Sequence, residues 1–164
     1  MLAFDALRLQ PFSLAEPLMR ISRSVVIYGF EFTRALEQAL TECPALGMHT
    51  GAVHLMWSQS VGGVELLKGY KYVWTHRDRQ PWGEPLPIQC KQCGTVQKWS
   101  SIYIKTNGSY KFECTYSKCR YEGDERKRNR LQFTVQRPEG AVFLPKCNGG
   151  QGAWMKTHIE LTVT

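Results

Sequence analysis

The sequence predicts an α+β protein, in which a small N-terminal α/β portion is followed by a cysteine-bearing β-hairpin extended into an antiparallel sheet. Apolar residues recur with helical spacing early in the chain, alternating patterns mark short strands later, and two close cysteine pairs flank β-prone runs. The 164 residues, 43% of them hydrophobic, fit one domain or two small ones. We expect an α/β portion over residues 1–80, a proline-rich linker over 81–87 and a second domain over 88–164.

Two helices are predicted in the N-terminal portion. Ser13–Glu16 fits a capping box, and Pro17 would be tolerated there only within the first turn. Residues 31–40 place apolar side chains at i, i+3, i+4, i+7 and i+8, which is one face of an amphipathic helix. Pro44 and Gly47 are expected to end it.

Short strands are predicted where β-prone or alternating apolar residues lie between turn signals. These segments are residues 25–28, 52–57, 70–74, 131–135 and 159–163. The last two alternate apolar and polar residues, so we expect both to extend the second domain's hairpin into a larger antiparallel sheet.

That hairpin is predicted over residues 99–114. Two β-prone runs flank Thr106-Asn107-Gly108, and Asn-Gly is the strongest short hairpin signal because both residues tolerate positive φ. A two-residue turn would pair Tyr103 with Phe112 and Ser101 with Cys114. One face would then carry Trp99, Tyr103, Tyr110 and Phe112, and the other Ile102, Ile104, Lys111 and Glu113.

The cysteine spacing carries the strongest functional signal. Cys90-Lys-Gln-Cys93-Gly94 is followed after twenty residues by Cys114-Thr-Tyr-Ser-Lys-Cys119. Two such pairs offer four thiolates at the corners of a tetrahedron, which suits one structural Zn²⁺. A disulfide framework is the competing interpretation, although low cysteine content and the absence of a signal-peptide pattern favour a reducing, intracellular compartment.

With its hairpin and its glycine after the first pair, this segment resembles a four-cysteine zinc ribbon over residues 88–122. The departure is the second pair, where four residues separate the cysteines and many ribbons have two. The resemblance implies a structural zinc held by Cys90, Cys93, Cys114 and Cys119. Members of this class stabilise structure or bind nucleic acid or protein, so it suggests a ligand without naming one.

Positive charge is concentrated in the same region. Residues 88–137 hold eleven Lys and Arg against four Asp and Glu, and their excess equals the net charge of +7 of the whole chain. A polyanion such as single-stranded DNA or RNA would be attracted by such a region, although a solvated basic face is the alternative. Arg126–Arg130 also resembles a nuclear import signal.

Cations interleaved with aromatics could contact phosphates while rings stack on unpaired bases. The candidate nucleic-acid-binding residues are Lys98, Trp99, Tyr103, Lys105, Lys111, Arg120, Arg126, Lys127, Arg128 and Arg130. The aromatics could instead form the core beneath the hairpin, and the protein would then be structural or would bind another protein, through an apolar patch around Trp57 or Trp82. No membrane partner is expected, because no apolar run is long enough to span a bilayer.

An enzymatic role is the least favoured. Gly29–Leu36 resembles the helix after the catalytic strand of caspase-like, metacaspase-type domains, a resemblance spanning residues 24–40. Residues 1–28 contain no His or Cys, so no catalytic residue carries over. The resemblance implies at most a remnant without activity. The unpaired Cys43 and Cys147 have no His that the sequence places beside them.

Overall fold

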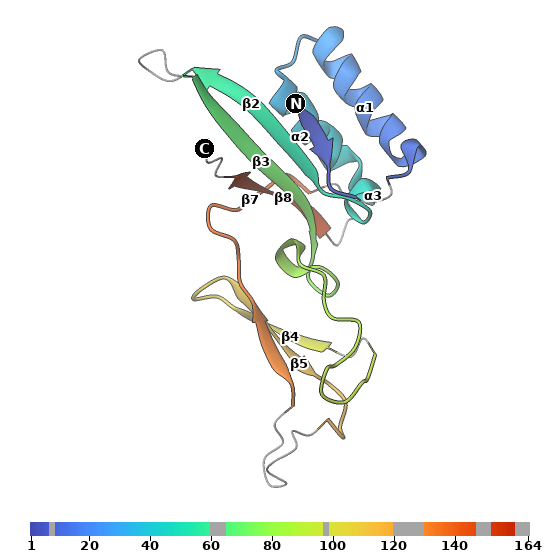
Figure 1. The fold of residues 1–164 in the computed structure, drawn as a ribbon, viewed down its shortest axis with the longest axis vertical. Helices are drawn as coiled ribbons and strands as arrows, with labels where there is room; N and C mark the ends of the chain where they lie inside the picture. Colours follow the sequence, from blue (N-terminus) through green and yellow to red (C-terminus); the bar gives the residue numbers. More distant parts are fainter. Residues whose placement is uncertain (7–8, 60–64, 97–98, 120–129, 147–151, 160–164) are drawn as a thin grey trace. The chain divides into compact units, whose positions relative to one another are not determined.

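The computed structural model describes residues 1–6, 9–59, 65–96, 99–119, 130–146 and 152–159 (Figure 1). The chain divides into two compact units, with Met1–Thr75 and Glu139–Thr164 in unit 1 and His76–Pro138 in unit 2. Unit 2 is therefore an insertion in the sequence of unit 1. Each unit has one antiparallel sheet, and the described α-helices all lie in unit 1, so the predicted α+β class is confirmed. None of the described helices is long and apolar enough to cross a membrane.

Unit 1 is a five-stranded sheet whose core side packs against helices. Its elements are β1 (Leu2–Phe4), α1 (Pro11–Val26), α2 (Phe32–Glu42), α3 (Pro44–Gly47), β2 (Ala52–Gln59), β3 (Glu65–His76), β7 (Val142–Phe143) and β8 (Gly152–Ile159). The strand order is β1-β2-β3-β8-β7. Helix α2 places Leu36 and Leu40 in the core with Tyr72 of β3 and Trp154 of β8.

Helix α1 begins earlier than the sequence predicts. Pro11 occupies the first turn, where its missing N–H costs nothing, and Gln10 is the N-cap. Ser13–Glu16 is therefore inside the helix and forms no capping box. Pro17 is also interior and is buried, so burial of apolar surface offsets the lost backbone hydrogen bond.

Helix α1 also ends later, so the predicted strand at residues 25–28 is wrong. Val25 continues the helical face of Leu14 and Ile21, and all three pack in the core. Helical spacing thus outweighs the β preference of Val25 and Val26, because tertiary packing of one face supplies most helix stability.

The amphipathic helix predicted at residues 31–40 is confirmed as α2. Glu31 is its N-cap, and its carboxylate accepts hydrogen bonds from the backbone N–H of Thr33 at 2.9 Å and of Arg34 at 3.0 Å. The hydrogen bond from Thr33 is the main reason that the pKa of Glu31 is lowered. A charged cap also complements the positive end of the helix dipole.

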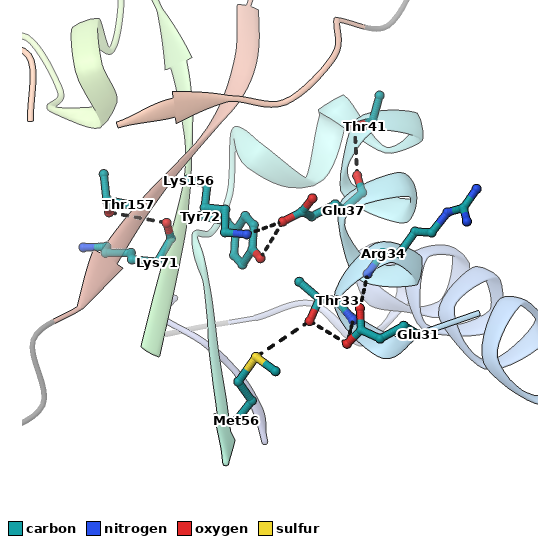
Figure 2. Close-up of polar contacts among 10 residues, drawn as sticks. All are labelled: Glu31, Thr33, Arg34, Glu37, Thr41, Met56, Lys71, Tyr72, Lys156 and Thr157. Atoms are coloured by element: carbon teal, nitrogen blue, oxygen red, sulfur yellow. Dashed lines mark hydrogen bonds and ion pairs between the residues drawn. The ribbon is translucent and has the colours of Figure 1, made fainter. Parts of the chain in front are cut away.

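A polar cluster joins α2 to the sheet (Figure 2). Oε1 of Glu37 accepts hydrogen bonds from Lys156 Nζ at 2.7 Å and from the Tyr72 hydroxyl at 3.1 Å. Tyr72 is fully buried, and burial raises the pKa of its hydroxyl, which therefore stays a donor. The ammonium of Lys156 also lies 4.1 Å from the centre of the Tyr70 ring. The cluster satisfies a buried hydroxyl and fixes the rotation of α2.

The C-terminal strand belongs to unit 1, which corrects the sequence-based expectation. β8 lies beside β3, where Thr75 donates to the Ala153 carbonyl at 3.0 Å and Thr157 to the Lys71 carbonyl at 3.4 Å. The segment predicted as a strand over 159–163 has one described residue, Ile159, and this residue ends β8. Residues 160–164 are outside the described part of the chain.

Unit 2 contains the predicted hairpin and a third strand. Its elements are the 3₁₀ turn η1 (Pro81–Gly83), β4 (Trp99–Ile104), β5 (Ser109–Cys114) and β6 (Gln132–Val135), and the strand order is β4-β5-β6. β6 pairs antiparallel with β5, with Phe133 opposite Phe112, so the predicted extension by residues 131–135 is confirmed.

The hairpin register differs from the predicted one by two residues. Tyr103 lies opposite Tyr110 and Trp99 opposite Cys114, which leaves a four-residue turn from Lys105 to Gly108. Asn107 accepts hydrogen bonds from the backbone and hydroxyl of Ser109 at 3.1 and 2.7 Å, and Gly108 takes φ +65°. A shift of two keeps every side chain on its predicted face.

The proline-rich segment at 81–87 is part of unit 2. Trp82 adopts a left-handed φ of 51° and is buried. The centre of its ring lies 5.5 Å from that of Tyr110 and 5.6 Å from the guanidinium carbon of Arg137. The backbone of Leu86 donates to the Arg79 carbonyl at 3.0 Å. The strain at Trp82 is therefore held by aromatic packing.

Candidate metal centre

Two turns bring the four cysteines together. In the first, the backbone of Gly94 donates to the Cys90 carbonyl at 2.8 Å and that of Cys90 to the Thr95 carbonyl at 2.9 Å. Gly94 takes φ +70°, which explains the glycine after the first pair. In the second, Cys114 ends β5 and Cys119 donates its N–H to the Tyr116 carbonyl at 3.0 Å. The longer second spacing thus still closes a tight turn.

The four Sγ atoms all lie within 4.8 Å of one another and could hold a metal ion. The Cys90–Cys119 separation is 3.9 Å and the Cys93–Cys114 separation is 3.7 Å. These distances far exceed a disulfide bond of about 2.05 Å. Four sulfurs at about 2.3 Å from a tetrahedral centre are about 3.8 Å apart, so the separations match a four-thiolate site.

The centre is shielded from water except at one corner. Cys90, Cys114 and Cys119 are buried, whereas Cys93 is half-buried, and Trp99, Tyr116 and Leu131 pack around them. Neither Tyr116 nor Leu131 was predicted from the sequence to be part of the site. Tyr116 lies between the two cysteines of the second pair. Leu131 begins the alternating segment that leads into β6, and its backbone carbonyl accepts a hydrogen bond from the backbone N–H of Cys114 at 3.0 Å.

The four thiols differ in acidity. The Thr95 side chain, 3.3 Å from Cys93 Sγ, is the largest influence lowering the pKa of Cys93 to about 6. Burial raises the pKa of Cys114 to about 12 and also raises that of Cys119. Buried thiols resist ionisation without a cation, so a divalent ion would supply the charge that holds them as thiolates.

The aromatic face of the hairpin is largely core, which answers the question that the sequence left open. Phe112 is 1% exposed and stacks on Phe133 with ring centres 5.4 Å apart. Trp99 packs edge-on against Phe133 at 4.9 Å, and its indole N–H donates to the Pro87 carbonyl at 2.8 Å. Tyr103 remains 44% exposed. A buried ring cannot stack on a base, so Phe112 has a structural role.

Trp99 also lines a cavity of about 540 Å³ within unit 2. Asp78, Arg79 and the segment Leu86–Ile88 form its other described walls. This volume is in the range of small-ligand pockets. His76 accepts a hydrogen bond at Nδ1 from the backbone of Asp78 at 3.2 Å, so these two residues form a polar turn beside the cavity.

The candidate basic residues are only partly described. Lys105 is exposed in the hairpin turn, Lys111 is half-buried on the face opposite the aromatics, and Arg130 lies 3.6 Å from the Glu113 carboxylate. The remaining candidates are outside the described residues: Lys98, Arg120, Arg126, Lys127 and Arg128. Of the two tryptophans considered for a protein-binding patch, Trp57 is 68% exposed and Trp82 is buried.

Comparison with known proteins identifies no relative. No family model matches the chain, and no curated protein or solved structure matches it. Neither the zinc-ribbon nor the caspase-like resemblance is therefore supported by a relative.

Proposed function

We propose that unit 2 is a zinc ribbon, in which Cys90, Cys93, Cys114 and Cys119 hold one structural Zn²⁺. The observation that carries this proposal is the clustering of four sulfurs within 4.8 Å, at separations that fit a tetrahedral site. Four thiolates fill the coordination of zinc and leave no position for water, so the ion stabilises the fold and does not act as a Lewis acid.

Elemental analysis of purified protein tests the metal, with one zinc per chain expected. Replacing Cys114 by Ser should remove the zinc and unfold the hairpin unit, because apparent binding energies of structural zinc are about 10–16 kcal/mol and exceed the stability of most small domains. Cys43→Ser is the matched control, since Cys43 is also buried but lies in unit 1. A Cys114→Ser protein with full zinc content would refute the assignment.

We further propose that the ribbon contacts single-stranded nucleic acid. Unit 2 contains 13 Lys and Arg against six Asp and Glu, whereas unit 1 contains eight of each. The whole net charge of +7 is therefore in the unit with the cysteine centre. Exposed Tyr103 and the Trp99 cavity would receive unpaired bases, while Lys105 and the basic segment 126–130 would contact phosphates.

A salt titration with labelled single-stranded DNA and RNA tests this contact. Affinity should fall steeply with salt, and Lys105→Ala should lower the slope of log affinity against log salt by about 1. Lys71→Ala removes the same charge from an exposed position in unit 1 and should leave the slope unchanged. Zinc-loaded protein that binds no oligonucleotide would leave a structural role for the ribbon, and protein binding would then be sought at the exposed Trp57 of unit 1.

A further inference from the structure

The outward face of α1 in unit 1 is unusually apolar. Phe12 is 83% exposed, Met19 72% and Val26 81%, and Leu18 beside them is 42% exposed. The opposite face of the same helix packs in the core through Leu14, Ile21 and Val25. Single exposed apolar residues need no explanation, but a stripe along a whole helix marks an interaction surface.

The stripe has the spacing of a helix–helix seam. Phe12, Ala15, Met19, Ser22 and Val26 are separated alternately by three and four residues, which are the a and d positions of successive heptads. A helix that packs only against the core of its own unit needs one apolar face. Helix α1 has a second one, the exposed stripe, in addition to the face that packs in the core. Ala15 and Ser22 at the d positions are small, so a second helix could approach closely.

The charged residues beside the seam are complementary to those of a second copy of α1. Glu16 and Arg23 follow the two d residues and are exposed on the same edge of the stripe. If a second α1 packs antiparallel, with Met19 opposite Ser22 and Ala15 opposite Val26, Glu16 lies beside Arg23 of the second copy. Two-fold symmetry repeats this pair. A parallel pair would instead place Leu18 beside Arg23, so the charges favour the antiparallel arrangement.

Existing contacts leave both charges able to make this pair. Glu16 accepts from Arg20 through Oε1, and a carboxylate accepts about four hydrogen bonds. Arg23 donates to the Tyr28 hydroxyl at 2.9 Å through one nitrogen, and a guanidinium has five donors.

We propose that α1 is a homodimer interface, which packs antiparallel against α1 of a second copy through the Phe12–Val26 stripe and two Glu16–Arg23 ion pairs. The inference concerns unit 1 and is independent of the proposed zinc and nucleic-acid functions.

Sedimentation velocity of the full chain over a range of concentrations tests the interface, with a mass that rises from one chain to two. Met19→Glu buries a charge in the seam and should leave a monomer at every concentration. Met48→Glu is the matched control, because Met48 is 61% exposed and lies off the stripe, and it should dimerise like the wild type. Far-UV circular dichroism checks that both variants fold.

Charge reversal tests the arrangement itself. Glu16→Arg and Arg23→Glu each turn two attractive pairs into repulsive ones and should weaken dimerisation on the order of tenfold. The double variant exchanges the charges and should restore the wild-type dissociation constant. A wild-type protein that stays monomeric would overturn the proposal. A wild-type dimer whose double variant has a dissociation constant no lower than those of the single variants would overturn the antiparallel register.

Discussion

The Glu37 cluster permits a quantitative prediction for the stability of unit 1. Glu37→Ala removes the acceptor of the Tyr72 hydroxyl, which is fully buried, and the partner of Lys156, whose side chain is 23% exposed. Leaving a buried hydroxyl unsatisfied costs about 1–3 kcal/mol, and a partly exposed ion pair adds up to about 1 kcal/mol. The free energy of unfolding should therefore fall by about 1–4 kcal/mol.

Urea denaturation followed by circular dichroism at 222 nm measures this change, since the described α-helices lie in unit 1. Tyr72→Phe is the control, because it removes the hydroxyl together with its need for an acceptor and should cost less than about 1 kcal/mol. In the Tyr72→Phe background, Glu37→Ala should cost about 1–2 kcal/mol less than in the wild type. Strict additivity of the two substitutions would refute the idea that Glu37 stabilises mainly by satisfying Tyr72.

Three further outcomes are expected in unit 1. Gly152→Ala should lower the free energy of unfolding by about 3 kcal/mol, because the new Cβ would lie 2.5 Å from Trp74 Cε2 and 2.7 Å from the Thr75 carbonyl oxygen. Gly140→Ala is the comparison: its Cβ would meet open space, and the φ of +65° alone should cost about 1 kcal/mol. Urea denaturation midpoints compare the two variants. Glu31→Ala should lower stability by about 0.5–2 kcal/mol by removing the α2 cap, and Glu31→Gln should recover part of it in the same assay. Burial lowers the pKa of His54, so the unfolded chain takes up a proton first as the pH falls, and stability should fall as the pH drops below about 6.5. His54→Gln should flatten this dependence between pH 7 and 5, as urea midpoints at each pH would show.

Local signals were sufficient to predict the hairpin, α2 and the cysteine cluster. Asn107-Gly108 marks the turn, the apolar spacing over residues 31–40 marks the helix, and the two cysteine spacings close tight turns, each within about ten residues of sequence. Because strand periodicity is two, the faces of β4 and β5 were correct even though the register was shifted. The exact turn was missed because Asn107 bonds to Ser109 and stabilises a four-residue loop.

Non-local packing decided the features that the sequence did not predict. Val25 and Val26 have a strand preference, but Val25 completes a helical face that is stabilised by packing against the core of unit 1. The strand predicted at residues 159–163 was expected beside the hairpin that precedes it in sequence, yet β8, over residues 152–159, pairs with β3, about 80 residues earlier. The aromatics of the hairpin were ambiguous because Phe133, which covers Phe112 and Trp99, comes from a strand beyond the second cysteine pair.

The insertion of unit 2 within unit 1 has a kinetic consequence. The β3–β8 seam, which completes the five-stranded sheet, closes only after the 63 residues from His76 to Pro138 have been synthesised. Closing a flexible loop of that length costs about 4 kcal/mol of chain entropy. The hairpin of β4 and β5 is built from local contacts and can form first, so the order in which the chain emerges from the ribosome favours folding of the inserted unit before the sheet that surrounds it in sequence.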